Sequence, residues 1–182
     1  MDRDHDVIRC VLDGDVESFR HLVRRYERPL HRLIRNLVPD AHEGEDIAQE
    51  VFLTAYRRLS SYDPTQAAFS TWLFTIARNK CLNALQKRRP VVMDTLPEAT
   101  GPRAPDAELA EAEWFRRLDE VLDTLPFTQK SVFVLAEIEG LSLVEIGRIE
   151  GVPIGTVKSR LCRAKEKLRS ILRPAEQPDV RS

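Results

Sequence analysis

The chain has 182 residues, of which 42% are apolar and 31% are charged, and its formal net charge is −1. This length accommodates one ordinary domain or two small ones, and the apolar fraction is sufficient for a packed core. A near-neutral total argues against a protein that binds DNA by itself, because neutralisation of backbone phosphates supplies most of that affinity.

The three cysteines, Cys10, Cys81 and Cys162, are odd in number and far apart in the sequence. Without a C-x-x-C pair they indicate neither a disulfide framework nor a structural zinc site, and we expect no metal and no cofactor. No apolar run approaches the roughly 20 residues that a membrane-spanning helix needs. The charged N-terminus has no apolar signal core after it, so we expect a cytoplasmic protein without stable membrane insertion.

Three helices are predicted in the first half, and long segments rich in β-branched and aromatic residues are hard to find, which favours an all-α fold. Apolar residues recur at helical spacing from Phe19 to Leu37, with Pro29 as the point where a kink or break would fall. A second helix is expected over 47–59, after acids suited to a first turn. Residues 60–66 predict a loop, and a third helix follows over 69–85.

The composition changes at Pro90, and no sustained periodicity follows until about residue 108. The prolines in this stretch predict an extended, flexible linker, so we divide the chain into a domain at 1–89, a linker at 90–108 and a domain at 109–182. In the second domain a helical pattern starts near Trp114 and is broken by Pro126. A short apolar helix is then expected over 127–139, with Gly140 beyond its end.

The most specific local pattern lies near the C-terminus. Ser142 and Glu145 have the spacing of a capping box, which predicts a short helix ending near Glu150. Gly151 can adopt the left-handed turn conformation, and a long basic helix is expected over 154–172. Its predicted buried stripe is Ile154, Val157, Leu161, Ala164, Leu168 and Leu172. Together these signals predict a helix-turn-helix whose second helix enters the DNA major groove.

Cations are concentrated in two stretches, over 78–89 and over 154–173. On the second, Arg163 points away from the apolar stripe and suits a guanine edge, whereas Lys158, Lys165 and Lys167 suit phosphates. A plain amphipathic helix with a solvated basic face is the alternative. Two basic patches on a near-neutral chain indicate weak DNA binding that needs a partner.

These motifs resemble a known family, the extracytoplasmic-function (ECF) sigma factors of bacterial RNA polymerase. Residues 141–147 (LSLVEIG) and 152–165 (VPIGTVKSRLCRAK) strongly resemble region four of that family. Residues 45–52 (EDIAQEVF) resemble the polymerase-binding helix of region two, and 69–79 (FSTWLFTIARN) resemble its promoter-melting helix. The similarity covers nearly the whole chain outside the linker and both tails, in the order that the family shows.

The resemblance implies a factor that binds core RNA polymerase, directs it to promoter DNA, performs no chemistry itself and is controlled by an anti-sigma factor. It implies contacts with the core polymerase for Asp46, Gln49, Glu50 and Phe52. For the −10 element it implies Phe69, Trp72, Asn79, Lys80, Asn83 and Arg88. For the −35 element it implies Thr156, Lys158, Ser159, Arg160, Cys162 and Arg163, where Cys162 is smaller than the residue expected at its position.

The residue chemistry of the first half agrees with this assignment. Unpaired bases stack on aromatic side chains and their backbone attracts cations, which Phe69, Trp72 and the basic stretch supply. A flipped base needs a pocket, and the loop at 60–66 is the candidate wall. Core packing is the alternative role for both aromatic residues, because both lie on the apolar stripe.

Two other classes of protein are the alternatives. An ordinary helix-turn-helix regulator would share the C-terminal motif, but the first half shows no phosphoacceptor or ligand domain. An enzyme fits least, because the sequence has no glycine-rich phosphate loop and no nucleophile elbow. The histidines are scattered without paired spacing, and only His42, beside Glu43 and Asp46, hints at a metal site.

Overall fold

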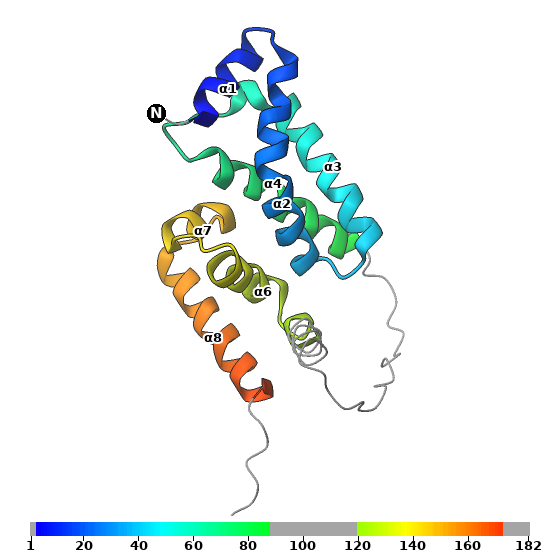
Figure 1. Ribbon diagram of the computed structural model, residues 1–182. Coiled ribbons are helices and arrows are strands. Elements are labelled where there is room, and N and C mark those ends of the chain that lie inside the picture. Colours follow the sequence, from blue (N-terminus) through cyan, green and yellow to red (C-terminus); the bar gives the residue numbers. More distant parts are fainter. Residues whose placement is uncertain (1–2, 88–119, 173–182) are drawn as a thin grey trace, which may run out of the picture.

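A computed structural model describes residues 3–87 and 120–172, and within these ranges every regular element is helical (Figure 1). The first half contains α1 (Arg3–Leu12), η1 (Val16–Ser18), α2 (Phe19–Leu37), α3 (Ala41–Arg57), η2 (Leu59–Ser61) and α4 (Phe69–Lys87). The second half contains α6 (Phe127–Phe133), η3 (Val134–Ile138), α7 (Leu143–Glu150) and α8 (Ile154–Leu172). The predicted linker, Arg88 and most of the helix expected from Trp114 lie outside the described residues.

Helix α2 forms the centre of the first half. It continues through Pro29 as one helix and buries Leu22, Leu30, Leu33, Ile34 and Leu37 against α3 and α4. The α3 helix begins six residues earlier than the apolar pattern predicted, because the Asp40 side chain accepts a hydrogen bond from the Glu43 N–H at 3.1 Å and caps it.

Helix α1 was not predicted from the sequence. Its buried apolar residues are Ile8 and Val11, and two residues make too short a pattern to predict a helix. The carboxylate of Asp4 accepts hydrogen bonds from Arg25 and Tyr26 of α2. Tertiary contacts therefore hold this helix where periodicity is weak.

The second half confirms the predicted helix-turn-helix. The Ser142 hydroxyl accepts from the Glu145 N–H at 3.3 Å, and the Glu145 carboxylate accepts from the Ser142 N–H at 2.9 Å, which completes the capping box. Gly151 has a φ of 66°, so it ends α7 in the left-handed conformation. Gly147 packs so closely on the turn that a Cβ atom there would lie 3.1 Å from the Val152 carbonyl oxygen.

The segment before the helix-turn-helix contains a π-helical turn, η3, which directly continues α6. The Glu139 N–H donates to the Val134 carbonyl at 3.0 Å, the five-residue spacing of such a turn. Val132, Val134 and Leu135 are fully buried here. Together, α6 and η3 contact α2, α7 and α8.

Helix α8 packs mainly on α6, and Val157, Ala164 and Leu168 of the predicted stripe are buried. Ile154 is an exception, because it is 42% exposed at the first position of the helix. The expectation that it is buried was wrong, since the stripe begins before the neighbouring helices cover it.

The two halves are in direct contact (Figure 1), which the sequence did not predict. Helix α4 packs against α7, and α2 packs against η3 and α6. One apolar cluster extends from Leu33 and Phe74 of the first half to Leu135, Ile146 and Ile149 of the second. The described halves therefore share a core.

Candidate nucleic-acid and polymerase interfaces

A hollow of about 410 Å³ lies between α3 and α4, and we call it the α3–α4 hollow. Four residues predicted to contact the −10 element line it together: Trp72, Asn79, Lys80 and Asn83. Its other walls come from Thr54, Arg58, Thr75 and Ile76, which were not predicted from the sequence. Arg58 could have been found as an exposed cation at the end of α3, beside the loop named as a pocket wall.

An aromatic cluster supports one side of this hollow. The Phe69 ring lies 5.4 Å from Tyr26, 5.6 Å from Tyr62 and 5.6 Å from Trp72, between ring centroids. Phe69 is 1% exposed, so in this conformation it presents no face to a base, whereas Trp72 is half-buried. The position of Phe69 fixes Tyr62 and Trp72 at the surface, and Tyr62 comes from the predicted loop.

Lys80 connects two surfaces that were predicted separately. Its Nζ donates to Glu50 Oε2 at 2.8 Å, although Glu50 was assigned to the polymerase and Lys80 to DNA. This hydrogen bond and the charge of Lys80 lower the pKa of the Glu50 carboxyl. The two predicted surfaces therefore meet along the contact between α3 and α4.

The residues assigned to the polymerase lie along α3. Asp46, Gln49 and Glu50 are exposed, whereas Phe52 is half-buried. Gln49 and Phe52 also line an apolar groove of about 570 Å³. Its other lining residues include Val16, Phe19, Val23, Leu53 and Tyr56.

This groove was missed in the sequence, although Leu53 and Tyr56 are apolar residues outside the stripe of Ile47, Val51 and Ala55. Leu53 is 53% exposed and Tyr56 is 38% exposed. Exposed apolar side chains grouped beside acidic ones are typical of a surface that binds another protein.

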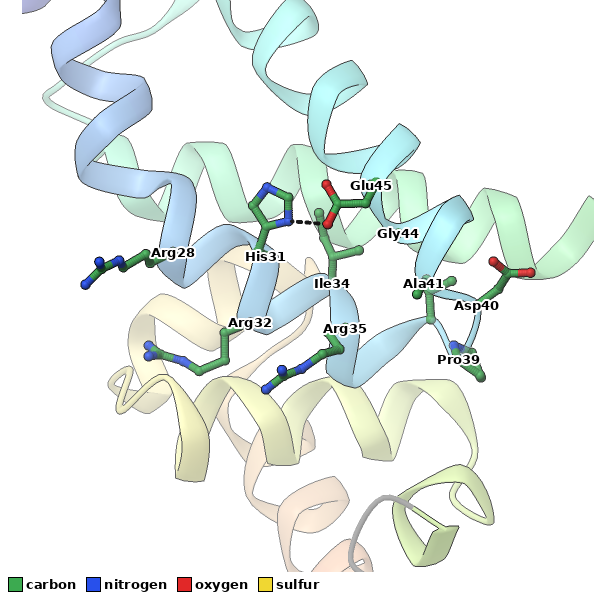
Figure 2. A pocket seen from close by; sticks show the side chains of 11 residues that line it. Arg28, His31, Arg32, Ile34, Arg35, Pro39, Asp40, Ala41, Gly44 and Glu45 are labelled. Carbon is green, nitrogen blue, oxygen red and sulfur yellow. Dashed lines mark ion pairs between the residues drawn. The ribbon is translucent and has the colours of Figure 1, made fainter. Parts of the chain in front are cut away.

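A cationic hollow of about 450 Å³ adjoins the start of α3 (Figure 2). Arg28, Arg32 and Arg35 of α2 line it, together with His31, whose Nδ1 lies 3.4 Å from the Glu45 carboxylate. Glu45 begins the motif assigned to the polymerase, so this hollow borders the same surface. The described residues contain no group of three or more His, Cys, Asp or Glu that could hold a metal ion.

The face of α8 that is predicted to contact the −35 element is exposed to solvent, and we call it the recognition face. Lys158, Ser159, Cys162 and Arg163 are all exposed on it. The Ser159 hydroxyl donates to the carbonyl of the half-buried Thr156 at 2.9 Å. The Cys162 thiol lies 3.4 Å from the Glu166 carboxylate, and this contact raises the pKa of the thiol.

Three basic side chains of α8 are engaged with other groups. Arg160 Nη1 donates to Glu150 at 3.1 Å, and this side chain is only 23% exposed. Lys165 pairs with Glu137 at 2.8 Å, and Lys167 donates to the Thr124 carbonyl at 2.6 Å. The recognition face therefore carries fewer unengaged basic side chains than the basic stretch at 154–173 contains.

Comparison with known proteins identifies the family. The model of sigma-70 region 2 matches residues 22–91, and that of sigma-70 region 4 matches residues 115–168. The ECF RNA polymerase sigma factor SigW of Bacillus subtilis is 35% identical over 179 residues, which cover 91% of this chain and 95% of SigW. The chain belongs to the ECF sigma factors. The ECF sigma-E factor of Escherichia coli K12 is 33% identical, over 94% of this sigma factor and 95% of its own length.

Solved structures agree with this membership. CnrH, solved in complex with the cytosolic domain of CnrY, matches with a TM-score of 0.74 and 26% identity, over 94% of this chain and 97% of CnrH. The sigma factor RpoE of Bartonella quintana, solved with the anti-sigma factor NepR, shows the same fold, with a TM-score of 0.68 and 22% identity over 86% of this chain and 97% of RpoE.

The family match distinguishes between the functions that the sequence suggests. An ECF sigma factor is a transcription initiation factor that binds core RNA polymerase and promoter DNA, so the family predicted from the motifs is confirmed. The family is one of transcription initiation factors, and the ordinary helix-turn-helix regulator is therefore set aside. None of the described helices is both long and apolar enough to cross a membrane.

Proposed function

We propose that the two halves of this sigma factor divide promoter recognition. The first half, residues 1–89, binds core polymerase and captures the −10 element as a single strand. The second half, residues 109–182, binds the −35 element as duplex, and residues 90–108 link the two. The convergence of Trp72, Asn79, Lys80 and Asn83 on one hollow is the observation that carries this proposal.

The −10 strand would enter the α3–α4 hollow. Trp72 offers a partly exposed ring for stacking, and the amides of Asn79 and Asn83 can bond base edges. Lys80 and Arg58 would face the strand backbone. Phe69 acts from beneath by holding Trp72, and Arg88 extends the basic stretch beyond the described residues.

The −35 duplex would receive α8 in its major groove. Arg163 can form two hydrogen bonds with a guanine edge, Ser159 and Cys162 contact neighbouring bases, and Lys158 contacts a phosphate. Thr156 lies at the start of the same face. Arg160 would reach DNA only after leaving Glu150.

Core polymerase would bind along α3. Asp46, Gln49 and Glu50 supply polar contacts, and Phe52 lies beside the groove that contains Leu53 and Tyr56. The sigma factor itself carries out no chemistry, since the polymerase synthesises the RNA. We propose that it acts in the cytoplasm, together with these partners.

An anti-sigma factor would control this activity. CnrH was solved with the cytosolic domain of CnrY, and RpoE of Bartonella quintana with the anti-sigma factor NepR. We propose that a comparable protein covers the polymerase-binding and DNA-binding faces of this chain.

Run-off transcription with purified core polymerase on a promoter library tests the proposal. The protein should direct core polymerase to start sites that share a −10 and a −35 motif, and it should bind core polymerase without DNA. Core polymerase alone is the control. If the protein does not redirect core polymerase to any start site, the proposed function is wrong.

A further inference from the structure

Helix α1 has no role in the function proposed above, yet one of its acids is bound closely by α2. The Asp4 side chain is only 9% exposed, and it accepts hydrogen bonds from the Arg25 guanidinium and the Tyr26 hydroxyl. Burial of a carboxylate is costly unless charges and hydrogen bonds compensate for its lost hydration, as these two donors do. Because each donor bonds a different carboxylate oxygen, Asp4 fixes the hydroxyl end of Tyr26.

The ring of Tyr26 packs toward the proposed −10 surface. It lies 5.4 Å from the Phe69 ring between centroids, and Phe69 lies 5.6 Å from both Tyr62 and Trp72. Tyr62 and Trp72 also contact each other, with centroids 5.4 Å apart. These tilted and edge-on pairs are favourable aromatic geometries, so each ring limits the positions open to the next. Phe69 is 1% exposed in a close-packed interior and cannot shift without displacing its neighbours.

Helix α1 also contacts η2, at the start of the loop that is predicted to wall the base pocket (Figure 1). Within this loop the Tyr62 hydroxyl donates to the Ala67 carbonyl at 3.0 Å. The Asp63 carboxylate accepts from the N–H and the hydroxyl of Thr65, at 2.9 and 2.7 Å. These bonds give the loop a defined shape. Helix α1 therefore contacts both elements that carry the aromatic support of Trp72, namely α2 through Tyr26 and the loop through η2.

We infer that Asp4 is a positioning residue for recognition of the −10 element. By holding the Tyr26 hydroxyl, it fixes Phe69 and thereby the Trp72 ring on which an unpaired base would stack. This inference rests on the proposed function. Asp4 does not reach the α3–α4 hollow, whose lining comes from α3 and α4, so it acts only through the aromatic rings. A ring that already has its bound orientation costs less to order, so affinity for the strand rises with the fraction of molecules in that state.

Two substitutions remove the same hydrogen bond from its opposite ends. Tyr26→Phe deletes the hydroxyl and keeps the ring, and Asp4→Ala deletes the acceptor. Each should weaken binding of a single-stranded −10 oligonucleotide to the holoenzyme about threefold to tenfold, because the fraction of correctly oriented Trp72 limits the apparent affinity. The double variant should lose no more than the more affected single variant, since both changes act on one bond. Assembly with core polymerase and binding of a −35 duplex should not change.

Fluorescence of Trp72 gives a second readout that needs no DNA. The other tryptophan of the chain is Trp114, so Trp114→Phe provides a background in which Trp72 alone emits. In that background, acrylamide should quench the emission more strongly when the Asp4–Tyr26 bond is removed, because the ring gains freedom. Asp6→Ala is the matched control on the same helix, since the exposed Asp6 pairs with Arg9 of α1 at 3.7 Å. It should leave quenching and −10 binding unchanged, and circular dichroism checks that each variant folds.

The positioning role is wrong if a folded Tyr26→Phe binds the −10 strand and is quenched like its parent. It is also wrong if the losses of the two single variants add in the double variant, if −35 binding weakens equally, or if Asp6→Ala has the same effect. Run-off transcription by the wild type reports separately on the proposed function. A wild type that initiates correctly, and loses −10 binding on Trp72→Ala but not on Tyr26→Phe, would overturn only the role of Asp4.

Discussion

The two proposed DNA-binding surfaces of this sigma factor differ in shape and in origin. The α3–α4 hollow is concave, and its lining comes from two helices, with the Tyr62 loop packed against Trp72 behind it. The recognition face of α8 is convex and comes from one helix. Unpaired bases must be enclosed to be distinguished, whereas the edges of paired bases are reached by a helix that protrudes. The first surface therefore depends on tertiary packing and the second mainly on one local motif.

The largest effect is expected for binding of the polymerase. We expect the polymerase to bind the acidic surface of the first half, and the second half has no corresponding surface in this proposal. Asp46→Lys should weaken holoenzyme assembly at least about a hundredfold, because charge reversal in a complementary interface costs several kcal/mol. Size-exclusion chromatography with core polymerase measures this, and circular dichroism checks the fold. Asp6→Lys, on an exposed side chain of α1, should assemble normally. Unimpaired assembly of Asp46→Lys would remove α3 from the interface.

The concave surface is tested at Trp72. Trp72→Ala should weaken binding of a single-stranded −10 oligonucleotide to the holoenzyme by roughly 1–3 kcal/mol, the contribution of one stacked base. A −35 duplex should bind as before. Trp72→Phe retains a ring and should recover much of the affinity. Equal loss for both DNAs would mean that the substitution acts through the fold and not through stacking.

The convex surface is tested at Arg163. Arg163→Ala should weaken −35 binding by roughly 1–3 kcal/mol and relax the preference at one base pair. Single-stranded −10 binding should not change. Arg169→Ala, in the last turn of α8, should at most weaken all sequences to a similar degree. An unaltered −35 motif in a selection experiment would show that the wrong face of α8 has been assigned.

The smallest effect is expected at the start of α7, where the capping box joins residues that are close in the sequence. Ser142→Ala removes the capping box and should lower the free energy of unfolding by about 1 kcal/mol. Urea denaturation measures the change, and hydrogen exchange should locate it in α7. Ser170→Ala removes a hydroxyl that donates only within α8 and serves as the control. Unchanged stability of Ser142→Ala would indicate that packing against α4, and not the cap, fixes α7.

The same contrast explains what the sequence could predict. The bounds of α8 and the capping box were correct, because Ser142, Glu145 and Gly151 signal helix ends through neighbouring atoms. Four of the residues that line the α3–α4 hollow came from family resemblance. Arg58 was missed although it is a cation next to the predicted loop, because its contact with the same hollow as Trp72 depends on the fold.

The contact between the halves could not be predicted, for a physical reason. Glu150 has the sequence context of an ordinary polar helix end, and its partner Arg78 lies 72 positions earlier. No periodicity connects two such residues. The error at Ile154 has the opposite cause, since its periodicity was correct but no neighbouring helix covers it.

The close approach at Gly147 has a consequence for promoter choice. A methyl group at that position would press on the Val152 carbonyl oxygen at 3.1 Å and push the turn outward by a few tenths of an ångström. Because α8 starts two residues after Val152, a shift of the turn would move the first turn of that helix. The space at Gly147 thus bears on the angle at which the side chains that we propose to contact bases would enter the groove.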